Sequence, residues 1–83
     1  MIVLTPNKTT GKQVYKIVMD AVRKHAKETN LNVTGMDFCR AAEISKQALH
    51  RYKNGIKPGS DSLVKIATGL KKWGNEVEIN ISI

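Results

Sequence analysis

The fold is decided by residues 38–55, FCRAAEISKQALHRYKNG, which combine a small residue, a short polar break and a closing Asn-Gly. Two helices can cross closely at Cys39 because its side chain is small. Ser45 can cap the second helix, since its hydroxyl can accept a backbone N–H bond left free in the first turn. We therefore expect a helix-turn-helix with helices over residues 35–42 and 46–54.

Hydrophobic spacing predicts the rest of the chain. Apolar residues recur at intervals of three and four over residues 10–30 and again over 60–73, which indicates a long amphipathic first helix and a fourth helix. MIVLT at residues 1–5 is followed by a proline and is typical of a short strand, and the tail at 76–83 alternates like a half-buried strand. No linker or repeat divides residues 1–83, so we expect one mainly α, small α+β domain.

The charge of the chain favours a polyanionic partner. Fourteen Lys or Arg residues against seven Asp or Glu residues give a formal net charge of +7. All the basic residues precede Trp73, whereas the tail carries Glu76 and Glu78. We therefore expect the tail to face away from the polyanion.

Other classes of function lack the residues that they need. The chain has one cysteine, and His25 and His50 have no Cys or second His at zinc-ligand spacing, so we expect no disulfide, metal or cofactor. No catalytic triad, paired acid cluster or Gly-rich phosphate loop appears, so we do not expect an enzyme. No apolar run approaches the roughly 20 residues that span a bilayer, and the first residues lack a secretory signal. A cytoplasmic protein without membrane contact is expected.

The outward face of the helix over residues 46–54 consists of hydrogen-bonding side chains. Leu49 and Tyr52 are three residues apart and face inward, which leaves four polar positions for the edges of DNA bases. These candidate base-contacting residues are Lys46, Gln47, His50 and Arg51. His50 could equally be a solvated surface residue. The candidate phosphate contacts, from side chains or free backbone N–H groups, are Gly35, Met36, Ser45, Lys53, Asn54 and Lys57.

The chemistry of the base contacts is specific. Arg51 can bond O6 and N7 of guanine together, Gln47 can bond N6 and N7 of adenine, and Lys46 favours the guanine acceptors. Each good bidentate pair discriminates against the wrong base by about 1 to 3 kcal/mol. The expected partner is double-stranded DNA.

Residues 34–72 resemble the helix-turn-helix of the Cro and lambda-repressor-like (XRE-type) family. In that family the positions that match Lys46, Gln47 and Arg51 typically read bases. The resemblance implies a lambda-repressor-like four-helix domain that binds a two-fold-symmetric operator as a homodimer. The matching residues are Cys39, Ile44, Ser45, Leu49, Tyr52, Asn54, Gly55, Pro58, Leu63, Ile66, Ala67 and Leu70.

Two residues depart from the family's pattern. Glu43 stands where the family usually has a glycine in the left-handed conformation, which costs another residue roughly 1 kcal/mol. We expect a slightly different turn there. Lys53 stands where the family often has an acid, and we expect it to add a phosphate contact.

The tail has two candidate partners. Val77, Ile79 and Ile81 share an apolar face, which could pair with the first strand inside the subunit or with the tail of a second copy. We expect both kinds of pairing, with these three residues at the dimer interface. Trp73 is expected to pack the end of the fourth helix against the first strand or the tail.

The expected function is a DNA-binding transcription regulator, in the form of a dimeric Cro-like repressor of phage, prophage or mobile-element origin. The alternatives are a protein-interaction module that covers another nucleic-acid-binding protein, an antitoxin, or a plasmid copy-control repressor. The operator, the regulated promoter, and the choice between repression and activation stay open.

Overall fold

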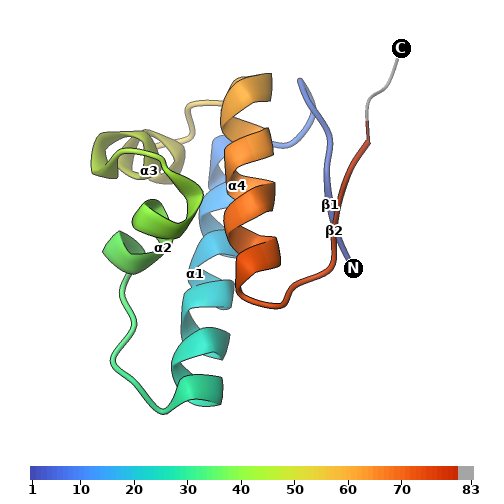
Figure 1. The fold of residues 1–83 in the computed structure, drawn as a ribbon. Helices are drawn as coiled ribbons and strands as arrows, with labels where there is room; N and C mark the ends of the chain where they lie inside the picture. The colour runs from blue at the N-terminus through green and yellow to red at the C-terminus, as the bar shows by residue number, and fades with distance from the viewer. Residues whose placement is uncertain (81–83) are drawn as a thin grey trace.

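The computed structural model describes residues 1–80 as four helices and two short strands (Figure 1). The protein is a small, mainly helical α+β domain, as expected. The two strands pair beside α4, on the side away from α3 (Figure 1). The elements in chain order are β1 (Ile2–Leu4), α1 (Gly11–Thr29), α2 (Gly35–Ala42), α3 (Lys46–Lys53), α4 (Ser60–Lys72) and β2 (Val77–Ile79).

α1 starts where its first turn is capped from both sides. The Gln13 N–H donates to Thr10 Oγ1 over 3.1 Å, and the Thr10 N–H donates to Gln13 Oε1 over 2.8 Å. The helix ends at Asn30, whose left-handed conformation breaks the helical hydrogen-bond pattern. The expected helix over residues 10–30 is therefore right apart from its two cap residues. The buried side chains of α1 form one stripe, made of Val14, Val18, Ala21 and Val22.

The turn between α2 and α3 has the left-handed residue that the family pattern places there. Glu43 has φ 58° and ψ 40°, so a glutamate adopts the conformation usually given to glycine. The slightly different turn that we expected at this position is therefore not observed. Ser45 caps α3 as expected, because its Oγ accepts the Ala48 N–H over 3.0 Å. Asn54 caps the far end of α3, one residue earlier than expected.

α4 packs across α2 at a point where a glycine is required. A Cβ added to Gly69 would lie 2.7 Å from the Cβ of Ala42, so the two helices touch there almost backbone to backbone. The remaining buried residues of α4 face a core shared by all four helices and β1. That core includes Leu4, Phe38, Cys39, Leu49, Tyr52, Leu63, Ile66, Ala67 and Leu70.

The two strands pair in parallel within the subunit, which confirms the expected internal pairing of the tail with the first strand. The register joins Ile2 to Val77 and Leu4 to Ile79. β1 is shorter than the expected strand over residues 1–5, because the chain turns away at Thr5, whose N–H donates to Thr9 Oγ1 over 2.8 Å. The remainder of the predicted 76–83 strand beyond residue 80, with Ile81, lies outside the described residues.

Trp73 packs the end of α4 against α1 and α2, and among residues 1–80 no ring-to-ring contact joins it to the strands that were expected as its partners. Its ring stacks on the imidazole of His25 from α1, with the centroids 4.3 Å apart, and meets the edge of Phe38 from α2 at 5.3 Å. As the C-cap residue of α4, Trp73 lies where α4 ends against α1 and α2. The indole therefore joins three helices.

Candidate nucleic-acid interface

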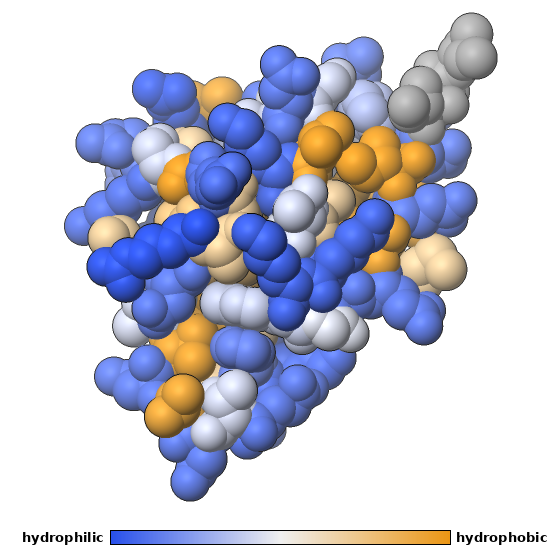
Figure 2. Space-filling model, viewed as in Figure 1, coloured by the Kyte–Doolittle hydropathy of each residue, from blue (hydrophilic) through white to orange (hydrophobic). Residues whose placement is uncertain are grey.

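The outward face of α3 brings together all four side chains expected to contact bases. Lys46, Gln47, His50 and Arg51 are exposed and line one shallow hollow on the surface of α3. Leu49 and Tyr52 on the opposite face are buried in the core. In the view of Figure 2, the region of α3 at the upper left is mostly hydrophilic. The helix thus presents hydrogen-bonding groups outward on a rigid support.

The orientation of α3 is set by its N-terminal cap and by the packing of its buried face. At its start, Ser45 caps the first turn and Ile44 packs against the core. Leu49 lies over the first turn of α2, where a Cβ added to Gly35 would be 3.2 Å from Leu49 Cδ2. Burial raises the pKa of the Cys39 thiol, so this residue is a protonated core side chain at the crossing of the two helices.

The candidate phosphate contacts lie at both ends of the motif. Gly35 and Met36 open α2, and Ser45 opens α3, so their N–H groups belong to the positive ends of the two helices. Lys53 and Asn54 close α3, and Lys57 lies in the turn that leads to α4. The structure thus places the six candidates in the motif and the turn that follows it, where backbone contacts would flank the base-contacting face.

Asp37 forms a capping box with Thr34 and adds a negative charge to the first turn of α2. Its carboxylate accepts the Thr34 backbone N–H over 2.8 Å and the Thr34 hydroxyl over 3.1 Å. These bonds, with the nearby Arg40 guanidinium at 3.5 Å, lower the pKa of Asp37 below its ordinary value. The carboxylate stays charged at neutral pH and fixes the start of α2, and its charge opposes that of a phosphate. The spacing of Thr34 and Asp37, three residues apart, is the sequence pattern that predicts such a capping box, and the structure confirms it.

Two of the candidate phosphate contacts make contacts inside the subunit. Lys57 Nζ donates to the backbone carbonyl of Asn7 over 2.7 Å, which ties the turn after α3 to the loop before α1. An ammonium has three donors, so two remain for another acceptor. Lys53 Nζ lies 6.0 Å from the centre of the Tyr15 ring on α1, at the outer limit of a cation–π contact. Both lysines are otherwise exposed.

Val77 and Ile79, the described part of the expected dimer interface, serve the fold of the subunit itself. Both are half-buried and pack against the core. Their backbone groups point the other way, because β2 bonds to β1 through the Glu76 carbonyl and the Asn80 N–H, each at 2.9 Å. No strand among residues 1–80 lies along the opposite edge of β2, which therefore presents the N–H and C=O groups of Val77 and Ile79.

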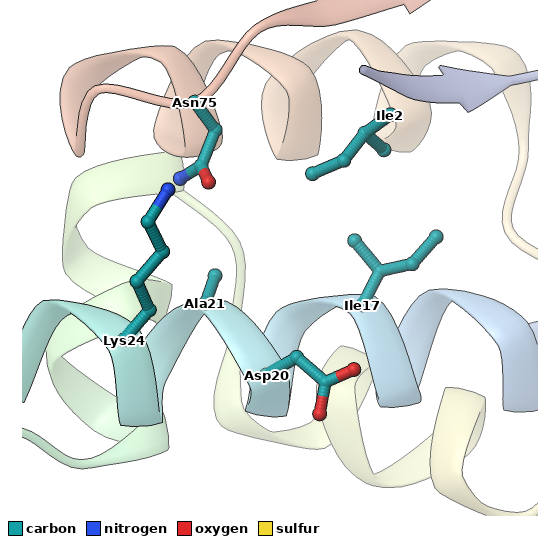
Figure 3. A pocket seen from close by; sticks show the side chains of 6 residues that line it. All are labelled: Ile2, Ile17, Asp20, Ala21, Lys24 and Asn75. Carbon is teal, nitrogen blue, oxygen red and sulfur yellow. The ribbon is translucent and has the colours of Figure 1, made fainter.

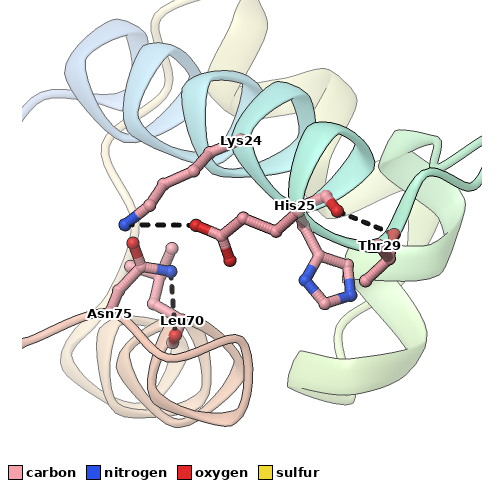
Figure 4. A network of polar contacts seen from close by, with 6 residues as sticks. Lys24, His25, Thr29, Leu70 and Asn75 are labelled. Carbon is pink, nitrogen blue, oxygen red and sulfur yellow. Dashed lines mark hydrogen bonds and ion pairs between the residues drawn. The ribbon is translucent and has the colours of Figure 1, made fainter.

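A second, smaller hollow lies between β1 and α1 (Figure 3). It has a volume of about 170 Å³, and its floor is the apolar pair Ile2 and Ile17, which point toward each other in Figure 3. Lys24 and Asn75 close one end, but each is already engaged: Lys24 pairs with Glu28 at 3.8 Å, and the Asn75 side chain donates to the Leu70 carbonyl over 3.0 Å (Figure 4). The hollow is smaller than the pockets that usually hold a cofactor.

The described part of the chain contains no group of three or more His, Cys, Asp or Glu side chains that could hold a metal ion. None of its helices combines the length and the apolar character needed to cross a membrane. No protein-family model, curated protein or solved structure matched the chain. The arrangement of α2 and α3, a helix-turn-helix in a strongly basic chain, is thus the observation that bears most directly on function.

Proposed function

We propose that the protein is a sequence-specific DNA-binding regulator that inserts α3 into the major groove of duplex DNA. The observation that carries the proposal is the outward face of α3, where Lys46, Gln47, His50 and Arg51 are exposed together on a capped helix with a buried opposite face. The domain that supports such a helix is already ordered before DNA binds, so the helix can read bases without a rearrangement of the domain. The net charge of +7 supplies attraction to phosphates.

The roles of the residues follow from their donors and acceptors. Arg51 reads guanine through two parallel N–H donors, and Gln47 reads adenine through one donor and one acceptor. The start of α2 and the turn after α3 hold the phosphates on either side. No side chain is assigned a catalytic role, because the proposed action is occupation of an operator.

Dimerisation is proposed through the open edge of β2. This edge offers the N–H and C=O groups of Val77 and Ile79 to a second copy, and an antiparallel pairing across a two-fold axis would satisfy both copies alike. The strands lie on the side away from α3 (Figure 1), which leaves both reading helices free to face one duplex. Two such helices would need a separation of about 34 Å, one turn of DNA. Together with the Cro-like sequence pattern, this favours a dimeric repressor.

The proposal is tested by selecting bound duplexes from a random library with the purified protein at two salt concentrations. We expect a two-fold-symmetric motif whose half-sites contain the guanine and adenine positions suited to Arg51 and Gln47. Weak, salt-sensitive binding without a motif would refute sequence-specific reading and would favour a protein-interaction module.

A further inference from the structure

A group of lysines lies outside the reading face, where α1 begins and α3 ends. Three chain segments meet there: the loop before α1, the first turn of α1, and the turn after α3. A Cβ added to Gly11 would lie 2.2 Å from the Ile56 carbonyl oxygen, so α1 starts directly against that turn. The bond from Lys57 Nζ to the Asn7 carbonyl, 2.7 Å long, joins the same turn to the loop. The three segments therefore form one continuous surface.

This surface carries four exposed lysines, which we call the lysine platform: Lys8, Lys12, Lys53 and Lys57. The side chain of Lys12 runs past the end of α3, because its Cε would lie 3.5 Å from a Cβ added to Gly55. The ion pairs of the described residues join Asp20 to Arg23, Glu28 to Lys24, and Asp37 to Arg40, so none involves the platform. Asp61, the nearest acidic residue along the chain, forms no ion pair among residues 1–80.

The platform continues the charge of the reading face beyond the C-terminal end of α3. Lys46 and Lys53 open and close α3, and a helix of that length extends about 12 Å, close to the width of the major groove. If α3 lies in the groove, its C-terminal end comes close to the phosphates that border the groove. The start of α1 lies against this same end through the Gly11 contact with Ile56. Lys8 and Lys12 thus stand beside the backbone that Lys53 and Lys57 would reach.

We propose that Lys8 and Lys12 bind duplex phosphates outside the groove occupied by α3, so that the footprint on DNA extends to the start of α1. This inference rests on the proposed function and adds to it two contacts beyond the helix-turn-helix. Lysine acts on phosphate as a point charge, so the platform contributes affinity and salt dependence without reading sequence.

The test is the salt dependence of binding to a random-sequence duplex several helical turns long. The variant Lys8→Gln with Lys12→Gln removes the two added charges. Lys65→Gln with Lys71→Gln removes two exposed lysines from α4 and is the matched control, since both double variants lower the formal net charge from +7 to +5. Each lost phosphate contact lowers the slope of log K against log salt by about 0.9, so we expect the platform variant to lose about 2 and the control to keep the wild-type slope.

Each outcome has a separate meaning. Equal slopes for the platform variant and wild type, or equal losses in the two double variants, would overturn the phosphate role of Lys8 and Lys12 while leaving groove binding by α3 intact. Wild-type protein that binds no duplex at all would overturn the proposed function and this inference together. The variant Lys8→Arg with Lys12→Arg keeps both positive charges and should therefore show the wild-type slope. Equal thermal unfolding of all variants would show that the fold is preserved.

Discussion

Individual residues of α3 divide the work of recognition, and their chemistry sets what each substitution should do. Gln47→Ala and Arg51→Ala each remove a side chain that is exposed in the folded protein, so neither should lower stability. Each should relax the preference for one base pair per half-site, by about 1 to 3 kcal/mol. Binding to operators with single-base changes measures this preference, and Lys65→Ala on α4 is the control. A uniform loss over all sequences would contradict a base-reading role.

The close approach at Gly11 makes a second prediction at this scale. Gly11→Ser places a Cβ 2.2 Å from the Ile56 carbonyl oxygen, so α1 and the turn after α3 must move apart. Such overpacking typically costs about 1 to 3 kcal/mol of the free energy of unfolding. Gly59→Ser is the matched control, because its Cβ would meet nothing within 4 Å and its position caps α4. Equal stability of the two variants in urea unfolding would show that the contact at Gly11 is relaxed in solution.

The elements of the chain could be predicted from the sequence to within a few residues, because their ends depend on local chemistry. Caps at Thr10, Ser45 and Asn54 place the helix boundaries, and hydrophobic spacing places their buried faces. The parallel direction of the two strands could not be predicted, since alternation has the same period in either direction. The same holds for the stacking of Trp73 on His25, which depends on how three helices meet.

The cap of α3 gives a prediction at the scale of the element. Ser45→Ala removes the acceptor of the Ala48 N–H, and loss of such a cap typically costs about 1 kcal/mol of stability. Affinity for the operator should fall as well, because the first turn of α3 carries Lys46 and Gln47. Chemical unfolding and duplex binding measure the two effects. Ser60→Ala in the first turn of α4 is the control, and an equal effect there would argue against a specific role of the α3 cap.

The start of α2 should depend on pH through Asp37. Its folded pKa lies below the ordinary value of 3.8 because the carboxylate accepts the Thr34 N–H and hydroxyl. The stabilisation is therefore complete above that ordinary value and is lost as the pH falls through the lower, folded value. The Asp37→Asn variant has no carboxylate to protonate at this position, so its stability should fall less between neutral and acidic pH than that of the wild type. Thermal unfolding of both proteins from about pH 5 down to pH 2 checks it, and parallel curves would contradict it.

For the whole molecule, the site was only partly predictable. The base-contacting set could be identified from residues near one another in the sequence, whereas the lysine platform joins Lys8 and Lys12 to residues more than forty positions away. Only the folded chain brings these segments together. The bond from Lys57 to Asn7 gave no local signal for the same reason.

The proposed dimer is tested by proline substitutions along β2. Val77→Pro removes an N–H from the open edge and should abolish dimerisation while the subunit remains folded, whereas Glu78→Pro removes an N–H that faces β1 and should disrupt the sheet. Sedimentation and circular dichroism distinguish these results. A folded Val77→Pro variant that is still dimeric would exclude the open edge of β2 as the interface.

The pairing of Ile2 with Val77 also bears on how the protein folds. All four helices lie within the loop that this pairing closes, and closing a loop of that length costs on the order of 4 kcal/mol in chain entropy. The contacts between the helices span shorter stretches of chain than the pairing of β1 with β2, so the helices should assemble first and the sheet should close last. The edge proposed for dimerisation would then exist only after this last step, and association of two copies would follow the completion of folding.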